Sequence, residues 1–493
     1  MNLHYKSTRN SDLRVTASEA ILTGLAPDGG LFVPEQIPKL DVSMEALSKM
    51  TYQETAYTVM KQFLTDFSEE ELKDCIRKAY DSKFDTGEIA PIVKAGDAYY
   101  LELFHGATIA FKDMALSILP YLLTTSAKKH HVENEIVILT ATSGDTGKAA
   151  MAGFADVEGT RIIVFYPKDG VSEVQKLQMI TQKGSNVDVA ALHGNFDDAQ
   201  SGVKALFEDE AFAEVLNEKG FQLSSANSIN IGRLVPQVVY YVYAYAKLLA
   251  YGEIEDGEEI NVTVPTGNFG NILAAYYAKQ MGVPIAKLIC ASNENRVLFD
   301  FFKTGVYDKN RAFVLTTSPS MDILISSNLE RLIYLIAGED SECTRKLMEA
   351  LKTDGRYEIT DEMKEKLADF AGGYADEMQT SQEIKNVYED TGYVLDTHTA
   401  VASYVCKMWK EEQDNGKKCL IASTASPYKF VKNVMTSIDK KWESYDELSL
   451  LERLQEVSGV EMPQAVKDIL DAKVLHRMEC DADHMKETVE KIL

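Results

Sequence analysis

The chain has 493 residues, of which 45% are hydrophobic and 26% are charged, and its formal net charge at pH 7 is -25. This length exceeds the size at which a single hydrophobic core stops growing, so we expect two or three domains. The negative charge argues against binding to nucleic acid or to an anionic membrane, and it requires that any anionic ligand be held by local donors.

The first 95 residues differ in pattern from the rest of the chain. Proline and glycine punctuate residues 26–34, and a helical pattern follows from Glu45 to Tyr80. We interpret residues 1–95 as an N-terminal domain. No signal peptide is visible, and the longest apolar run, 238–251, is too short to span a bilayer. The six cysteines lack a Cys-x-x-Cys pair, so we expect a cytoplasmic protein with reduced thiols.

From about Glu135 onward, short β-branched runs, loops with Gly, Asn or Ser, and helical stretches alternate along the chain. This order predicts an α/β fold with mostly parallel sheets covered by helices on both faces. The acidic turn 252–259 is expected to connect two α/β blocks, and the charged stretch 361–388 to be a helical surface element. The expected strands are Ile136–Leu139, Arg161–Tyr166, Val187–Ala191, Glu259–Val264, Ala286–Ala291 and Lys418–Ala422.

One lysine is well placed for chemistry. Lys112 follows a loop of small residues and opens an apolar helical stretch. The positive end of a helix dipole disfavours an ammonium group and so favours the neutral, nucleophilic amine that a Schiff-base lysine needs. A single lysine in such a place is more often a surface residue of an amphipathic helix, so the assignment depends on the neighbouring loops.

A glycine loop between an expected strand and helix, 267–271, has the layout of a phosphate site. Gly267 and Gly270 let successive backbone N–H groups converge on an anion at a helix N-terminus. The third glycine and the acidic ribose partner of a dinucleotide site are missing. The loop therefore indicates a phosphate site or an ordinary tight turn.

The loop 140–147 combines hydroxyl side chains with two glycines, which suits a small carboxylate; the alternative is a helix N-cap with surplus threonines. The pair Gly147-Lys148 is similar to part of a nucleotide P-loop. However, Thr142 and Ala149 occupy positions where that motif needs glycine and a hydroxyl residue, which argues against a nucleoside triphosphatase.

Three other segments have weaker signals. The polar loop 224–233 ends in Arg233, whose guanidinium could hold a second phosphate, although such a loop is often unremarkable. The adjacent pair His130-His131 lacks spaced carboxylates or cysteines, so we expect no metal site. The motif 396–400 is expected to be a helix N-cap and a domain contact, with His398 facing the cleft as the lesser alternative.

Together these motifs resemble the threonine synthases, pyridoxal-phosphate enzymes of fold type II (tryptophan synthase β-like), and in particular the longer family members. The resemblance covers nearly the whole chain and rests on the segments Tyr5–Arg9, Gly24–Pro34, His105–Asp113, Ala141–Gly147, Val264–Asn271, Ser318–Ile323 and Asp322–Arg331. It implies two open, twisted, mostly parallel sheets flanked by helices, plus the N-terminal domain. The expected large domain comprises 96–130 and 216–493, and the small domain 131–215.

The resemblance also implies site residues for the cofactor pyridoxal 5'-phosphate and for a substrate. Lys112 matches the lysine that carries the cofactor as a Schiff base, and Thr424 matches the residue beside its pyridine nitrogen. The phosphate loop of the cofactor corresponds to Gly267, Asn268, Phe269, Gly270 and Asn271. The family's carboxylate loop corresponds to Thr142, Ser143, Asp145 and Thr146, and shorter members place the substrate phosphate at Asn227, Ser228 and Arg233.

Two departures from the family pattern concern the charge of the site. Asp145 stands where shorter members have asparagine, and a carboxylate near an anionic ligand needs a proton or a donor partner. In the loop 423–427, which contains Thr424, Ser426 stands where many relatives have a histidine.

The function that the resemblance implies is a β,γ-replacement, in which O-phospho-L-homoserine and water yield L-threonine and phosphate in the last step of threonine biosynthesis. A related lyase, such as a threonine dehydratase-like enzyme, and a catalytically silent homologue are the alternatives. We expect a small-molecule enzyme that acts as a monomer or homodimer, without nucleic-acid or membrane partners.

Overall fold

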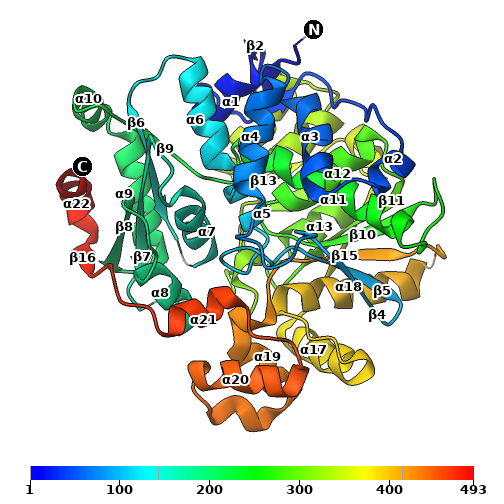
Figure 1. Ribbon diagram of the computed structural model, residues 1–493. Helices are drawn as coiled ribbons and strands as arrows, with labels where there is room; N and C mark the ends of the chain where they lie inside the picture. The colour runs from blue at the N-terminus through cyan, green and yellow to red at the C-terminus, as the bar shows by residue number, and fades with distance from the viewer. Residues whose placement is uncertain (1, 143, 170, 414) are drawn as a thin grey trace.

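Two sheets organise the protein, which we describe from a computed structural model covering residues 2–142, 144–169, 171–413 and 415–493 (Figure 1). The larger sheet has the strand order β14-β11-β10-β15-β5-β4, and the smaller one has the order β16-β8-β7-β6-β9. Their strands pair in parallel, apart from the antiparallel pair β4 and β5. The mostly parallel α/β architecture predicted from the sequence is thus confirmed.

The larger sheet contains β4 (Ile92–Ala95), β5 (Ala98–Glu102), β10 (Ile260–Pro265), β11 (Ile285–Ser292), β14 (Phe370–Tyr374) and β15 (Cys419–Ser423). Every residue of β10 is buried, as expected for a central strand that helices cover on both faces. Its helices include α5 (Asp113–Leu116), α6 (Leu119–Lys129), α11 (Ile231–Ala250), α12 (Gly270–Met281), α13 (Val297–Thr304) and α18 (Thr397–Gln413).

The smaller sheet contains β6 (Glu135–Ala141), β7 (Thr160–Pro167), β8 (Val187–His193), β9 (Phe221–Ser224) and β16 (Met478–Asp481). Its helices are α7 (Asp145–Phe154), α8 (Glu173–Ile180), α9 (Phe196–Glu208), α10 (Glu210–Glu218) and α22 (Met485–Ile492). The red C-terminal segment lies beside this sheet in Figure 1, because β16 pairs with β8.

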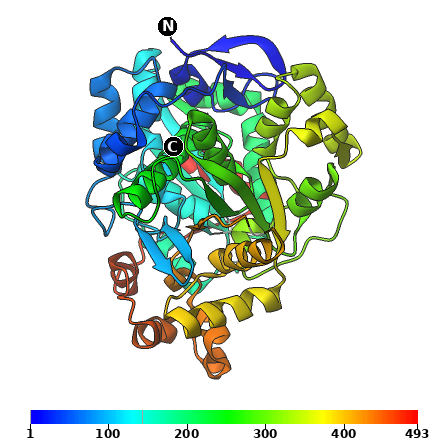
Figure 2. The same ribbon diagram turned by 90° about the vertical axis from the view of Figure 1, so that its right-hand side faces the viewer.

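The N-terminal elements form a layer over the larger sheet and its helices (Figure 2). They are β1 (Tyr5–Ser7), β2 (Asn10–Val15), β3 (Phe32–Pro34), α1 (Ala17–Thr23), α2 (Met44–Ser48), α3 (Tyr52–Phe63) and α4 (Glu69–Ala79). A capping box starts α3, where the side chains of Thr51 and Glu54 each accept a hydrogen bond from the other residue's backbone N–H. Helices α2 and α3 pack against α11, which is buried along nearly its whole length.

The remaining elements lie between residues 306 and 470, and most of them pack around the larger sheet. They are β12 (Val306–Asp308), β13 (Arg356–Glu358), α14 (Leu329–Ile336), α15 (Ser341–Thr353), α16 (Asp361–Glu365), α17 (Glu377–Thr391), α19 (Val431–Ile438), α20 (Glu447–Ser458) and α21 (Gln464–Leu470). Short 3₁₀ turns occupy Pro319–Met321, Pro427–Phe430, Lys440–Ser444 and Ala482–His484. Within the described ranges, no helix is long and apolar enough to cross a membrane.

The six expected strands are present as β6, β7, β8, β10, β11 and β15, and the helical pattern from Glu45 to Tyr80 corresponds to α2, α3 and α4. The stretch 361–388 was expected to be a helical surface element; it contains helix α16 and most of helix α17, and also the edge strand β14. The sequence of β14 gives only a weak strand signal, because it contains two adjacent glycines and is only partly buried. The turn 252–259 leads from α11 to β10, so it does not join the two sheets; the chain leaves the smaller sheet for the larger one at 225–230.

Two strands from the predicted large domain pair with strands of the smaller sheet. Residues 216–493 were assigned to the large domain, yet β9 pairs with β6 and β16 pairs with β8 in the smaller sheet. Both strands are four residues long, and their partners lie far away in sequence. Such non-local pairing leaves no local pattern in the sequence.

Candidate active site

One cavity between the two sheets gathers the predicted residues. It measures about 290 Å³, and its lining includes residues that directly follow β6, β9, β10 and β15. The carboxyl ends of parallel strands are where open α/β sheets bind ligands. Ser143 lies outside the described residues. The other thirteen predicted residues all line the cavity: Lys112, Thr142, Asp145, Thr146, Asn227, Ser228, Arg233, Gly267, Asn268, Phe269, Gly270, Asn271 and Thr424.

Lys112 precedes the short helix α5, and a tight loop fixes its position. Gly106 allows the close approach of Asp113, whose carboxylate accepts hydrogen bonds from the backbone N–H and the hydroxyl of Thr108 at 2.8 and 2.6 Å. Ile109 in this loop has a φ of 54°, a strained value for a β-branched residue. The loop is also tied to the Thr424 segment, since the N–H of Phe111 donates to the carbonyl of Thr424 at 2.8 Å.

The amine of Lys112 is biased towards its neutral form. Burial is the main cause that lowers its pKa; Asp145 opposes this effect, and the charges of Lys429 and Arg233 reinforce it. This lowered pKa agrees with the expectation from the sequence. Its main cause is burial and not the expected helix dipole, because α5 has only four residues and its terminus contributes little.

Asp145 begins α7 and receives the donors that a carboxylate at this position requires. Its Oδ1 lies 3.2 Å from Nζ of Lys429 and accepts a hydrogen bond from Gln175, and its Oδ2 accepts a hydrogen bond from Ser320 at 3.0 Å. Nζ of Lys112 is 3.6 Å from Oδ2. Burial alone would raise the pKa of Asp145, but Lys429 and Lys112 hold it well below its usual range. Asp145 is therefore an ionised carboxylate.

The loop 267–271 has the free donors of a phosphate cradle. The backbone N–H groups of these residues donate to no acceptor in the part of the chain that the structure describes. Phe269 adopts a left-handed conformation (φ 68°) just before α12, and the N-terminus of this twelve-residue helix faces the cavity. A Cβ atom at Gly267 would lie 2.5 Å from the carbonyl oxygen of Ser320, so only glycine fits.

Two orphaned side-chain donors support anion binding in this cavity. Asn271 uses Oδ1 to accept hydrogen bonds from Tyr240 and Tyr241, and its buried Nδ2 has no partner among the described residues. Arg233 donates from Nη1 to the carbonyl of Ala226 at 2.9 Å, while its buried Nε is likewise without a partner there. Burial lowers the pKa of Arg233 to about 10, which leaves it cationic at neutral pH. Unpaired buried donors of this kind are expected where a ligand completes the site.

The two polar loops that precede α7 and α11 also line the cavity, as predicted. Thr142 Oγ1 accepts hydrogen bonds from the N–H groups of Gly144 and Gly147, and so shapes the turn into α7. Thr146 lines the cavity one residue into that helix. Asn227 and Ser228 lie beside Arg233, with Asn227 exposed to solvent.

Two residues in or near the cavity, Ser320 and Lys429, had no predicted role, and His398 had only a secondary one. Ser320 Oγ accepts a hydrogen bond from Lys112 and donates one to Asp145, and Lys429 pairs with Asp145 from behind the cavity wall. His398 lines the cavity, which was the lesser of the two expectations; its Nε2 accepts a hydrogen bond from the N–H of Ser320 at 3.2 Å. Asp396 caps α18 as expected and also contacts Nδ1 of His398 at 2.9 Å. The segment 318–323 was the sequence signal that could have pointed to Ser320.

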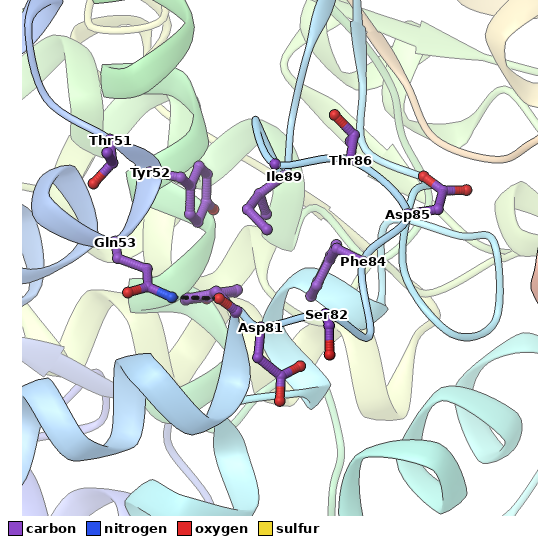
Figure 3. A pocket seen from close by; sticks show the side chains of 11 residues that line it. Thr51, Tyr52, Gln53, Asp81, Ser82, Phe84, Asp85, Thr86 and Ile89 are labelled. Atoms are coloured by element: carbon purple, nitrogen blue, oxygen red, sulfur yellow. Dashed lines mark hydrogen bonds between the residues drawn. The ribbon is translucent and has the colours of Figure 1, made fainter.

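A second hollow, between the start of α3 and the loop after α4, has a different character (Figure 3). It measures about 440 Å³ and is lined by aromatic and polar residues that include Asp81 and Asp85 but neither lysine nor arginine. Gln53 donates to the carbonyl of Tyr80 there, and Tyr80 donates to the carbonyl of Met114 in α5. Because its lining offers no cation, this hollow does not suit a phosphate.

The fold and the cavity define a class of enzyme. The family model described as "Pyridoxal-phosphate dependent enzyme" matches residues 94–424, and the model "Threonine synthase N terminus" matches residues 4–80. The donor set fits the cofactor of that class, since a buried amine, a helix N-terminus with free N–H groups and a buried asparagine amide face one cavity. The fold and cofactor class expected from the sequence are confirmed.

Similar proteins narrow the class further. A solved structure of pyridoxal-phosphate-bound threonine synthase from Brucella melitensis superposes with a TM-score of 0.87 at 34% identity, covering 100% of this chain and 98% of that chain. Threonine synthase from Saccharomyces cerevisiae is 37% identical over 88% of this chain and 89% of that protein. "Threonine synthase-like 1" from Pongo abelii is 42% identical over 86% of this chain but only 58% of its own length. The chain belongs to the threonine synthase family of pyridoxal-phosphate-dependent enzymes.

Proposed function

We propose that this protein converts O-phospho-L-homoserine and water to L-threonine and inorganic phosphate. The observation that carries the proposal is the presence of two separate groups of anion donors around one buried amine. The loop 267–271 is one group, and Arg233 with Asn227 and Ser228, from a different segment of the chain, forms the other; both line the same cavity. A phosphorylated substrate together with a phosphorylated cofactor needs both.

The residues divide the binding work as follows. Lys112 would hold pyridoxal 5'-phosphate covalently, the N–H groups of 267–271 would hold its phosphate, and Thr424 would lie beside its ring nitrogen. When bound, the cofactor supplies an electron sink that stabilises negative charge at Cα of the substrate. Arg233, Asn227 and Ser228 would bind the substrate phosphate, and Thr142, Ser143, Asp145 and Thr146 would surround its carboxylate end.

Lys112 then moves protons between substrate carbons. A neutral amine can accept the proton from Cα, and as an ammonium it can return a proton to the same face of the substrate. Its lowered pKa favours the neutral form that the first of these steps requires. Loss of phosphate from Cγ and addition of water at Cβ complete the replacement. Closure of the cavity over the bound substrate would keep bulk water away from the reacting carbons until that step.

The test is to supply phosphohomoserine to the cofactor-loaded protein and to measure threonine, phosphate, 2-oxobutyrate and ammonia. We expect equal amounts of threonine and phosphate. Formation of 2-oxobutyrate and ammonia would identify a related lyase, and an unchanged substrate would identify a silent homologue. Lys112→Ala should abolish product formation and the absorbance of the lysine-bound cofactor, whereas Lys129→Ala on the far end of α6 should change neither.

The finer expectations about location and assembly belong to the same proposal. A reducing compartment such as the cytoplasm suits the six cysteines, all of which are free thiols. The residues that line the cavity all belong to one chain, so a monomer or a homodimer could carry out the reaction.

A further inference from the structure

Three lysine amines lie around the carboxylate of Asp145, and of these three Lys112 alone lines the cavity. Lys112 faces the cavity, whereas Lys429 and Lys148 lie behind Asp145 and are 0% and 1% exposed. Fully buried lysines are rare unless their charge is paired or absent. The proposed binding sites therefore do not explain why Lys429 and Lys148 are buried.

Lys429 is paired on both sides. Its Nζ lies 3.2 Å from Oδ1 of Asp145 and donates a hydrogen bond to the carbonyl of Thr108 at 2.7 Å. Thr108 belongs to the loop that fixes Lys112, and Lys429 belongs to the turn that follows Thr424. From within the core, Lys429 thus connects the carboxylate of Asp145, the loop that contains Thr108 and the turn that follows Thr424.

Lys148 is the counterpart without a partner. It lies one helical turn after Asp145 on α7, and its Nζ makes no hydrogen bond to any described residue. Burial and the nearby charge of Lys429 hold the pKa of Lys148 well below its usual range. An uncharged amine is the state that such a position tolerates.

We propose that Lys429 is a positioning residue which keeps Asp145 ionised and oriented towards Lys112 and Ser320, while Lys148 stays uncharged and adds no further positive charge to the cluster. This arrangement explains how a carboxylate replaces asparagine at position 145. Asp145 favours the ammonium form of Lys112, and Lys429 neutralises enough of that effect to leave a usable base.

The other charged and titratable groups that face this cluster come from four further elements. They are Asp113 on α5, Arg233 on α11, His398 on α18 and Glu447 on α20. Replacing Lys429 with an uncharged residue leaves Asp145 to act on Lys112 with less compensation. The proton affinity of Lys112 should then rise.

Competitive labelling with acetic anhydride tests this inference without turnover. The cofactor-free full-length chain is labelled across a pH series, and the acetylated fraction of Lys112 is measured by peptide mass spectrometry. In Lys429→Met, the pH of half-labelling should rise by about one unit relative to the native chain. In Lys148→Met, the pH of half-labelling of Lys112 should shift by less than about a third of a unit, since this variant replaces an uncharged amine. Lys418→Met, at a surface lysine paired with Glu258, is the control and should leave it unchanged.

The inference rests on the proposed role of Lys112 but not on the substrate, so its failure is distinct from a failure to form threonine. An unchanged labelling profile in folded Lys429→Met would overturn it, as would an equal shift in Lys148→Met. In the loaded enzyme, the acid limb of the rate profile for threonine formation should move to higher pH in Lys429→Met. Lys429→Arg should restore most of the native profile.

A second variant covers the case in which Lys429→Met does not fold. The double variant Asp145→Asn/Lys429→Met removes both members of the buried pair, so it should melt closer to the native chain than Lys429→Met does. A double variant as unstable as Lys429→Met would show that Lys429 does not act through Asp145.

Discussion

Nζ of Lys112 donates a hydrogen bond to Oγ of Ser320 across 3.0 Å, although the two residues are 208 positions apart. The same hydroxyl donates to Asp145, so Ser320 lies between the amine and the carboxylate. Both contacts come from a 3₁₀ turn whose backbone also contacts His398 and packs closely against Gly267. The orientation of the proposed base thus depends on a segment that belongs to neither anion site.

Ser320→Ala should slow turnover with little effect on substrate affinity. The variant removes the hydroxyl that accepts from the Lys112 amine and donates to the ionised Asp145, and a hydrogen bond to a charged group contributes about 1.5–3 kcal/mol. We expect kcat for threonine formation to fall about tenfold or more and KM to change by less than about twofold. Ser320→Thr, which keeps a hydroxyl, is the matched control and should retain most of the activity. A native kcat in Ser320→Ala would mean that the hydroxyl does not orient the amine.

Gly267→Ala should weaken both the fold and the cofactor site. The new Cβ would lie 2.5 Å from the carbonyl oxygen of Ser320, so the backbone must move. Overpacking of this kind costs about 1–3 kcal/mol, and the displaced loop should bind pyridoxal 5'-phosphate less tightly. Urea unfolding and cofactor titration measure the two effects. Gly87→Ala, where a Cβ atom meets nothing within 4 Å, is the control. Native cofactor affinity in Gly267→Ala would argue against this loop as the phosphate site.

Arg233→Ala should separate substrate binding from cofactor binding. The orphaned Nε of Arg233 is the cationic donor proposed for the substrate phosphate. Loss of a charge-assisted contact predicts a decrease of about 10- to 100-fold in kcat/KM for phosphohomoserine. The dissociation constant of the cofactor should stay within about threefold of the native value. Arg233→Lys keeps a charge without the fork and should be intermediate. An equal loss of cofactor and substrate affinity would show that Arg233 belongs to the cofactor site.

His105 should make stability depend on pH in the alkaline range. Its ring nitrogens lie 2.6 Å from Asp85 and 2.9 Å from Glu102. Burial works against protonation, but the two carboxylates raise the pKa of His105 to about 9. A histidine with a raised folded pKa stabilises the protein fully below its unfolded pKa of about 6.5, and this contribution is lost as pH rises through about 9.

The shift corresponds to about 3 kcal/mol, which solvent around Asp85 reduces to about 2 kcal/mol. His105→Gln should therefore lower the free energy of unfolding by about 2 kcal/mol at pH 6 and by much less at pH 9.5. Urea unfolding at the two pH values checks this difference. His476→Gln, at a histidine that contacts the carbonyl of Gln182 and no carboxylate, serves as the control. An equal cost of His105→Gln at both pH values would contradict the prediction.

The sequence alone determined the parts of this protein that depend on local pattern. Buried β-branched runs such as Arg161–Tyr166 became strands, because such residues pack well on a pleated surface. Small residues in the loops before α7 and α12 predicted anion sites at helix starts, and the thirteen described residues that the family resemblance assigned to the site meet in one cavity. The resemblance to a family added roles that no spacing could supply.

Only the tertiary structure decided which distant groups control one another. The edge strand β14 and the short strands β9 and β16 exist because a neighbouring strand pairs with them, and their own residues have weak strand patterns. Lys429 and Lys148 look like ordinary surface lysines in the sequence, yet both are buried around Asp145. Charge and burial act through space over a few ångströms, whereas sequence patterns report on neighbours along the chain. For this reason, the protonation of Lys112 could be judged only after folding had brought Asp145, Ser320 and Lys429 around it.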